Sequence, residues 1–132
     1  MIILKKEKII QLHSKLIEKT GGIDGVRDMA MLETSIYSIY ASFGDYEKYP
    51  TIEEKSARLC YSMITNHPFI DGNKRIGILI MIMTLNLNNR ELEYTQEELV
   101  QLGLNVASSK QYDYNYVYSW IKEHLIRDKI KV

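Results

Sequence analysis

The sequence predicts an all-α protein, folded as a compact bundle of about six helices around one buried central helix. Apolar residues recur at helical spacing along most of the 132 residues. In addition, the run Ile78–Met83 is apolar on every face, as expected for a helix at the centre of the bundle. The length suits a single domain, residues 1–132, with a modest core.

The first two helices are predicted from the spacing of their apolar residues. One face of the first helix consists of Ile9, Leu12 and Leu16. The pair Gly21-Gly22 ends this helix, because glycine readily adopts the backbone conformations that terminate helices. Asp28 is placed as the N-cap of the second helix. The apolar positions of that helix are Met29, Leu32, Ile36, Ile39 and Phe43.

Two further helices are predicted from their N-terminal caps. Thr51 followed by Glu54, and Thr95 followed by Glu98, both match the capping box, in which each side chain bonds the other residue's backbone N–H. The apolar residues behind the first box are Ile52, Leu59, Cys60 and Met63. Those behind the second box are Leu99, Leu102 and Val106.

The central helix follows a polar segment and is expected to end near Asn88-Asn89. A last helix carries Val117, Trp120, Ile121 and Leu125. Residues 90–94 can be extended and residues 2–4 can form a short strand, but neither segment predicts a sheet. The apolar residues 76–83 fall far short of the ~20 needed to cross a bilayer, so we expect them to form core and not a membrane span.

Composition narrows the class of protein. The 17 basic and 17 acidic residues give a net charge of zero, so we expect no direct binding to nucleic acid or to an anionic membrane. The single cysteine, Cys60, excludes an internal disulfide and fits a reducing cytoplasm. The apolar run at the N-terminus is too short for a signal peptide. These observations predict a cytoplasmic protein.

The side chains suited to catalysis or ligand binding are concentrated in residues 67–77. Here an imidazole, a carboxylate, a carboxamide, an ammonium and a guanidinium lie on either side of Gly72. Pro68 and Gly72 keep the backbone out of a regular helix before the apolar segment begins. The free N–H groups at the start of the following helix then form an anion site at the positive end of the helix dipole. Lys74 and Arg75 add two cations, and arginine can hold a phosphate through two parallel hydrogen bonds.

Asp71 and His67 complete the predicted site. A carboxylate repels a phosphate, so Asp71 is expected to act through a bridging Mg²⁺. His67 is the side chain here that is suited to accept a proton near neutral pH. Together these residues indicate transfer of a phosphate-containing group to a hydroxyl. Taken singly, they allow other interpretations: His67 as a core or capping histidine, Asp71 as a solvated turn residue, or the two as ligands of zinc.

Other polar and aromatic residues are interpreted as structural. His13 lies on the apolar side of the first helix, and His124 is placed to complement the dipole at the end of the last helix. Phe69 is expected to anchor the loop in the core. The ten tyrosines suit packing and interfaces better than nucleic-acid stacking, because the chain has no basic surplus. Residues 21–28 can serve as a glycine-rich connection between helices.

The segment His67-Pro-Phe-x-Asp71-Gly-Asn-Lys-Arg75 closely resembles the signature of the Fic/Doc superfamily. Residues 21–28 and 31–36 resemble the N-terminal region of that family, so the resemblance covers roughly residues 4–125. Lysine at position 74 resembles the Doc branch, the death-on-curing toxins of toxin–antitoxin modules. The Fic branch usually has glycine at that position and a second arginine at the position of Ile78.

The resemblance implies a Fic/Doc-like domain that uses ATP and Mg²⁺. His67 would be the catalytic base and Asp71 would hold the metal. The residues that would bind the ATP phosphates are Gly72, Asn73, Lys74 and Arg75. Residues 21–28 would form a flap beside the active site that holds the target segment in extended form. Within this flap the candidate contacts are Gly22, Gly25 and Arg27.

Activity and partners follow from the same resemblance. It implies a toxin that phosphorylates a Ser or Thr hydroxyl of a target protein, which would be a translation factor such as an elongation factor. Two alternatives stay open: Fic-type adenylylation, and a non-catalytic module that binds a nucleotide or a partner. The segment Ser14 to Lys19 comes near the family's inhibitory-helix pattern but differs at the last position. A separate cognate antitoxin is therefore expected.

Overall fold

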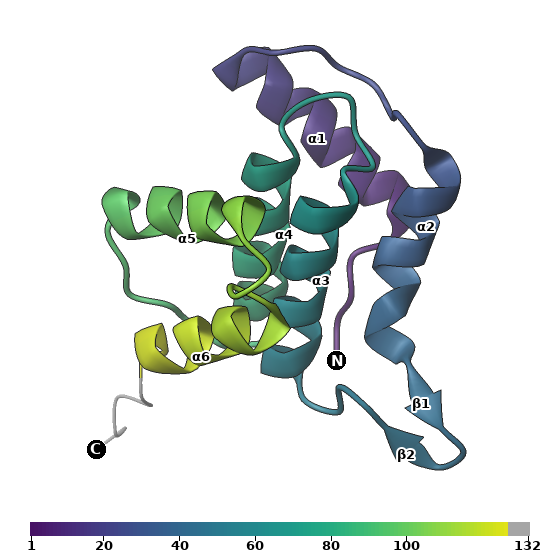
Figure 1. The fold of residues 1–132 in the computed structure, drawn as a ribbon, viewed down its shortest axis with the longest axis vertical. Coiled ribbons are helices and arrows are strands. Elements are labelled where there is room, and N and C mark those ends of the chain that lie inside the picture. The colour runs from purple at the N-terminus through teal and green to yellow at the C-terminus, as the bar shows by residue number, and fades with distance from the viewer. Residues whose placement is uncertain (127–132) are drawn as a thin grey trace.

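The computed structural model describes residues 1–126, which form six α-helices, one 3₁₀ turn and one small β-hairpin (Figure 1). The helices are α1 (Lys6–Thr20), α2 (Met29–Tyr37), α3 (Ile52–Asn66), α4 (Asn73–Leu87), α5 (Gln96–Ser108) and α6 (Tyr114–His124). The 3₁₀ turn η1 (Ser38–Tyr40) follows α2, and the hairpin pairs β1 (Ser42–Phe43) with β2 (Tyr46–Glu47). The predicted helical fold class is confirmed.

Helices α3 and α4 lie side by side at the centre of the bundle (Figure 1). α3 contacts α2, α4, α5 and α6, whereas α4 contacts α1, α3 and α5. One hydrophobic cluster joins this pair to α1 and α2, and a second joins it to α5 and α6. The helix predicted to be central is α4, and Ile76, Ile80 and Leu85 of this helix are fully buried. It shares the central place with α3.

The caps at the helix ends agree with the sequence. The Asp28 carboxylate accepts a hydrogen bond from the Met31 N–H at 3.0 Å and starts α2. Both predicted capping boxes form, at the starts of α3 and α5. Gly21 ends α1 with φ +90°. These contacts satisfy backbone groups that a helix end otherwise leaves without partners.

The second helix is shorter than predicted. It was expected to continue to Phe43, but α2 ends at Tyr37 and η1 leads into the hairpin, where Phe43 is 77% exposed. The reason lies in the two residues between the strands, Gly44 and Asp45, because Gly-Asp between short apolar runs favours a tight hairpin turn. Gly44 has φ +56°, a conformation that glycine adopts without strain.

Two segments predicted to be extended are held in different ways. Residues 90–94 pair with the chain after α6, through the bridge Leu92–Leu125 and the hydrogen bond from the Glu93 N–H to the His124 carbonyl at 2.8 Å. Residues 2–4 form no strand. Instead the Asn88 side chain bonds both the N–H and the carbonyl of Ile2, at 2.7 Å each.

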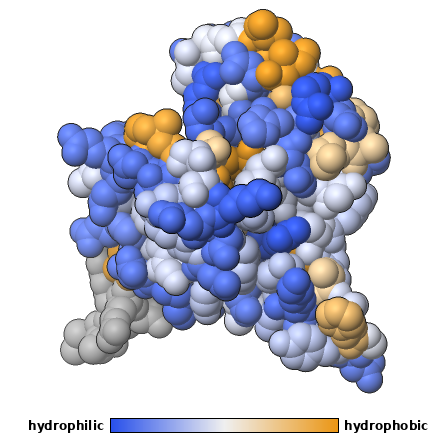
Figure 2. Space-filling view, viewed as in Figure 1, coloured by the Kyte–Doolittle hydropathy of each residue, from blue (hydrophilic) through white to orange (hydrophobic). Residues whose placement is uncertain are grey.

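The face of the molecule drawn in Figure 2 is largely hydrophilic. On this face hydrophobic residues gather at the top, at the upper left and on the protruding hairpin at lower right (Figure 2). Ile23, in the segment between α1 and α2, is exposed. Over residues 1–126, none of the helices is both long and apolar enough to pass through a membrane.

Candidate active site

The polar segment forms the loop between the two central helices, as predicted. α3 ends at Asn66, and His67 then adopts a left-handed conformation with φ +50°. Gly72 adopts a second left-handed conformation with φ +78°, after which Asn73 starts α4. We call residues 67–72 the motif loop. Its two left-handed positions turn the chain back so that α4 can lie beside α3.

Residues 21–28, which we call the flap, run antiparallel to the motif loop. Val26 forms a β-bridge with Phe69, and the Ile70 N–H donates to the Gly25 carbonyl at 3.0 Å. The backbone N–H groups of Arg27 and Asp28 both donate to the Pro68 carbonyl, at 2.8 and 3.0 Å. The flap therefore lies beside the motif loop, as predicted, and is held there by backbone hydrogen bonds.

Gly22 allows the flap to approach the motif closely. A Cβ atom at this position would lie 2.6 Å from the Asp71 carboxylate, and the backbone has φ +116°. Any other residue would therefore clash with the carboxylate and strain the backbone. The structure gives Gly22 a role in closing the flap over Asp71.

Asn73 turns its side chain into the protein. It is only 7% exposed, its amide oxygen accepts from the Phe69 N–H, and its amide nitrogen donates to the Phe69 carbonyl, both at 3.0 Å. The carboxamide predicted to bind phosphate is therefore engaged in holding the loop. The backbone N–H of Asn73, at the first position of α4, has no partner within the helix.

His67 lies at the surface with its ring held from one side. Its Nδ1 is 3.3 Å from the Thr65 carbonyl oxygen, which can only accept a hydrogen bond. Nδ1 therefore carries the hydrogen, and Nε2 keeps the lone pair that a general base requires. Arg27 holds the backbone here, donating to the carbonyls of His67 at 2.6 Å and Asn66 at 3.0 Å. The guanidinium of Arg27 thus caps α3.

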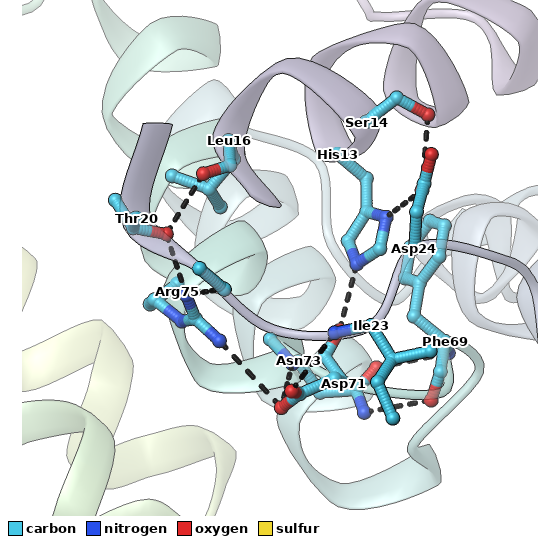
Figure 3. Close-up of polar contacts among 12 residues, drawn as sticks. His13, Ser14, Leu16, Thr20, Ile23, Asp24, Phe69, Asp71, Asn73 and Arg75 are labelled. Atoms are coloured by element: carbon cyan, nitrogen blue, oxygen red, sulfur yellow. Dashed lines mark hydrogen bonds and ion pairs between the residues drawn. The ribbon is translucent and has the colours of Figure 1, made fainter. Parts of the chain in front are cut away.

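The Asp71 carboxylate is 45% exposed and faces the flap (Figure 3). It accepts hydrogen bonds from the Ile23 N–H at 3.3 Å and the Gly72 N–H at 2.8 Å. Arg75 lies 3.5 Å away. The two backbone hydrogen bonds, with a smaller contribution from Arg75, lower the pKa of Asp71, although partial burial opposes the shift. The group is therefore a carboxylate at neutral pH.

The first turn of α4 contains positive charges and no acidic residue that would balance them. Gly72 supplies no capping side chain, and the first turn contains Lys74 and Arg75 but no acidic residue. Cations at this end oppose the helix dipole, which typically costs about 0.3–1 kcal/mol each. Such an arrangement is suited to an anion, which would contact both the charges and the free N–H groups.

The two cations are placed differently. Arg75 donates to the Gly21 carbonyl at 2.8 Å and to the Thr20 hydroxyl, so it connects α4 to the end of α1 (Figure 3). Lys74 is exposed, and its stem lies against α5, where a Cβ at Gly103 would be 3.5 Å from the Lys74 Cβ. Ile78 contacts the same place, with its Cδ1 3.1 Å from that Cβ position.

The residues present suit a metal that arrives with a phosphate. Within residues 1–126 there is no group of three or more His, Cys, Asp or Glu side chains that could hold a metal ion. Mg²⁺, however, is commonly held by one or two carboxylates together with substrate phosphates and water. The exposed, ionised Asp71 beside an anion-binding helix start fits that pattern.

An open cavity of about 270 Å³ lies next to His67. It is lined by the last turns of α3 and α5 and the residues that follow α5: Tyr61, Ile64, Thr65, His67, Val106, Ala107, Ser108, Ser109 and Lys110. Its size is close to the lower end of small-ligand pockets, roughly 300 Å³. The α5 side of this cavity was not predicted, because its residues carry no recognisable pattern in the sequence.

Comparison with known proteins agrees with this geometry. The family model described as "Fic/DOC family" matches residues 3–85, which include the flap, the motif loop and most of α4. The chain belongs to the Fic/DOC family. Among curated relatives, "Protein kinase doc" of Escherichia phage P1 is 27% identical over 107 residues, covering 81% of this chain and 83% of that protein. "Toxin Doc" of Mycolicibacterium smegmatis is 32% identical over 72 residues, covering 54% of this chain and 55% of that protein.

These relatives support a Doc-type member of the Fic/DOC family. His13, predicted from the sequence to be structural, is buried on α1 with its ring against the motif loop. The signal that places it inside is its spacing, since Ile9 and Ile17 stand four residues to either side and both are buried. What His13 contacts depends on how the motif loop folds against α1.

Proposed function

We propose that this protein is a Doc-type toxin that transfers the γ-phosphate of ATP to a Ser or Thr hydroxyl of a target protein. The observation that carries the proposal is the placement of His67. The Nε2 atom of His67 has no hydrogen-bond partner within the described residues, and the motif loop connects His67 directly to the anion-binding start of α4. Asp71, in the same loop, is ionised. A base and a phosphate site held this close by covalent structure are suited to transfer a phosphate between bound partners.

The phosphates would bind at the start of α4. The backbone N–H of Asn73 and the side chains of Lys74 and Arg75 would contact their oxygens, in keeping with the unbalanced charge there. The N–H of Gly72 is already bonded to the Asp71 carboxylate. Asp71 would hold Mg²⁺ against the same phosphates, and the ion would neutralise charge on the leaving group. The cavity beside His67 offers room for another part of the nucleotide.

The proton transfer follows from the ring orientation. Nε2 of His67 would take the proton of the target hydroxyl as its oxygen forms a bond to the γ-phosphorus. The bond between that phosphorus and the β–γ bridging oxygen breaks, and ADP leaves. The carbonyl of Thr65 keeps the Nδ1 hydrogen in place and thereby favours a ring that accepts at Nε2. Lys74 and Arg75 would stabilise the charge that develops on the phosphates.

Phosphorylation is preferred over adenylylation because of Lys74 and Ile78. A second arginine at position 78 would supply charge for the far phosphates, but here Ile78 packs against α5. The relative named "Protein kinase doc" carries the corresponding activity in its name. The protein partners that we propose are a translation elongation factor as substrate and a cognate antitoxin as inhibitor, and both follow from the resemblance to Doc-type toxins of toxin–antitoxin modules.

The test uses ATP labelled on the γ-phosphate in one reaction and on the adenine in a parallel one. The purified protein is incubated with a bacterial lysate or a purified elongation factor, and label is followed on protein. The proposal predicts transfer from the γ-phosphate alone. Transfer of the adenine label would instead establish adenylylation, and transfer of neither label would favour the non-catalytic module.

A further inference from the structure

His13 occupies the space between α1, the flap and the motif loop, and is 1% exposed (Figure 3). Its ring stacks on Phe69 with centroids 3.8 Å apart and planes 10° from parallel. Its Nε2 lies 2.7 Å from the Asp71 carbonyl oxygen, and its Nδ1 lies 3.4 Å from the Asp24 carboxylate. Asp24 also accepts from the Ser14 hydroxyl at 3.1 Å. One ring therefore contacts both the loop and the flap.

The contact with Asp71 fixes a single peptide plane. Because the carbonyl oxygen can only accept, Nε2 of His13 must carry the hydrogen. That carbonyl belongs to the peptide unit between Asp71 and Gly72, in which C=O and N–H point in opposite directions. The N–H end of the unit donates to the Asp71 carboxylate at 2.8 Å. His13 thus holds one end of the plane, and the carboxylate holds the other.

We propose that His13 is a positioning residue for the metal-binding and phosphate-binding groups. Gly72 is left-handed and has no side chain to resist rotation of this peptide plane. Without the Nε2 hydrogen bond the plane can turn, which would move the Gly72 N–H and release the Asp71 carboxylate from it. The role assigned to the bound metal and phosphate rests on the proposed function, whereas the control of the peptide plane does not.

Two substitutions separate the hydrogen bond from the packing. His13→Phe keeps an aromatic ring to stack on Phe69 but removes the donor. His13→Gln loses the ring but places an amide N–H close to the position of Nε2. A role limited to packing predicts that His13→Phe is the milder change. Positioning through the carbonyl predicts the reverse for every property of the loop.

The first readout is the apo protein, by amide hydrogen exchange of Gly72. His13→Phe should increase the exchange rate roughly tenfold, as expected for loss of one hydrogen bond, and His13→Gln should restore most of the protection. The second readout is calorimetric titration of ATP at a series of Mg²⁺ concentrations. His13→Phe should weaken Mg²⁺-dependent binding about 10- to 100-fold, the usual cost of losing an outer partner of a metal ligand, and His13→Gln should largely rescue it.

The outcomes distinguish the two proposals. Unchanged Gly72 exchange in a folded His13→Phe variant, or equal losses in both variants, would overturn the role of His13. If wild-type protein shows no Mg²⁺-dependent ATP binding, the proposed function fails, while the exchange experiment still decides about His13. Should His13→Phe not fold, His13→Asn replaces it, because an asparagine amide is too short to reach the Asp71 carbonyl. Thermal unfolding of each variant provides the control for folding.

Discussion

The motif loop and the first turn of α4 have an inner and an outer side, on which similar residues serve opposite purposes. On the inner side, Asn73 and His13 are polar but buried, and their side chains bond the loop backbone. On the outer side, His67 and Lys74 are exposed, and Asp71 and Arg75 are partly exposed. A buried polar group that loses its partner is costly, so inner residues are committed to structure, whereas outer residues are available to a ligand.

In this motif the chemical type of a residue does not by itself show whether its side chain holds the loop or faces a ligand. The resemblance to the Fic/Doc superfamily implied that Asn73 and Lys74 both bind phosphate, but Asn73 is buried and only Lys74 is exposed. Two histidines are likewise divided: His13 presents an N–H to the loop, whereas His67 leaves a lone pair towards solvent. Four substitutions test this division: one on each side, one where the flap meets the end of α3, and one on α6 away from the motif loop.

The largest effect is expected on the outer side, for His67→Asn. Asparagine tolerates the left-handed backbone at this position but cannot act as the base. Phosphate transfer should fall by about 10²–10⁴ while the free energy of unfolding changes little, because the ring is exposed. Initial rates with labelled ATP and urea unfolding measure the two quantities. His124→Gln, a histidine on α6, is the control. Retention of full transfer would remove His67 from the mechanism.

On the inner side, Asn73→Ala should mainly affect stability. The substitution removes two hydrogen bonds and leaves the buried N–H and carbonyl of Phe69 without partners. We expect a loss of about 2–4 kcal/mol in the free energy of unfolding, measured by urea denaturation. Asn115→Ala is the matched control, since Asn115 is exposed in the first turn of α6. A loss equal to that of the control would mean that the inner side does not hold the loop.

A smaller effect is expected for Arg27→Ala, because Arg27 lies where the flap meets the end of α3. Its guanidinium is exposed and donates to two carbonyls at the end of α3. The expected destabilisation is about 1 kcal/mol, typical of an exposed contact that caps a helix C-terminus. Arg90→Ala serves as control, because Arg90 is partly exposed and pairs with Glu53 away from the motif loop. If Arg27→Ala leaves stability unchanged and instead weakens binding of the target protein, Arg27 contacts the target directly.

The smallest effect is expected at His124, which lies on α6 away from the motif loop (Figure 1). Burial lowers the pKa of His124, but its hydrogen bonds to Glu98 and to the Trp120 carbonyl outweigh burial and leave the pKa raised. The same contact with His124 is the main cause that lowers the pKa of Glu98.

The sign of the pH dependence follows from these two shifts. The contribution of His124 is complete below its ordinary pKa of 6.5 and is lost as pH rises through the raised value. The contribution of Glu98 is present above its ordinary pKa of 4.5 and is lost as pH falls through the lowered value. Thermal unfolding of wild type and His124→Gln should therefore differ most between pH 4.5 and 6.5 and converge as the pH rises through the raised pKa of His124. A difference independent of pH would exclude the charged pair.

Much of the fold was predictable from local patterns. Capping boxes, apolar spacing and glycine at a helix end act within a few residues, so their consequences can be derived without the tertiary structure. The hairpin was missed because the apolar spacing of α2 continues into Phe43, although Gly44-Asp45 carries the competing turn signal. The prediction followed the apolar spacing and extended the helix, whereas in the structure the chain turns at Gly44-Asp45.

The site was predictable in its members but not in the direction of each side chain. Side chains in a helix point back towards its N-terminus, so an asparagine at the first position of α4 reaches Phe69, four residues earlier. This conclusion requires knowing that the helix begins at Asn73, which the two left-handed residues determine. The contact between His13 and the Asp71 carbonyl joins residues 58 positions apart and depends on tertiary packing.

The most direct test of the account is the intact mass of a purified elongation factor after incubation with ATP, Mg²⁺ and this protein. Peptide mapping then locates the modified residue, and a parallel reaction contains the His67→Asn variant. We predict that the wild-type protein adds the mass of one phosphate to a Ser or Thr, and that the variant adds almost none in the same time. Addition of the mass of AMP, or equal modification by the variant, would contradict it.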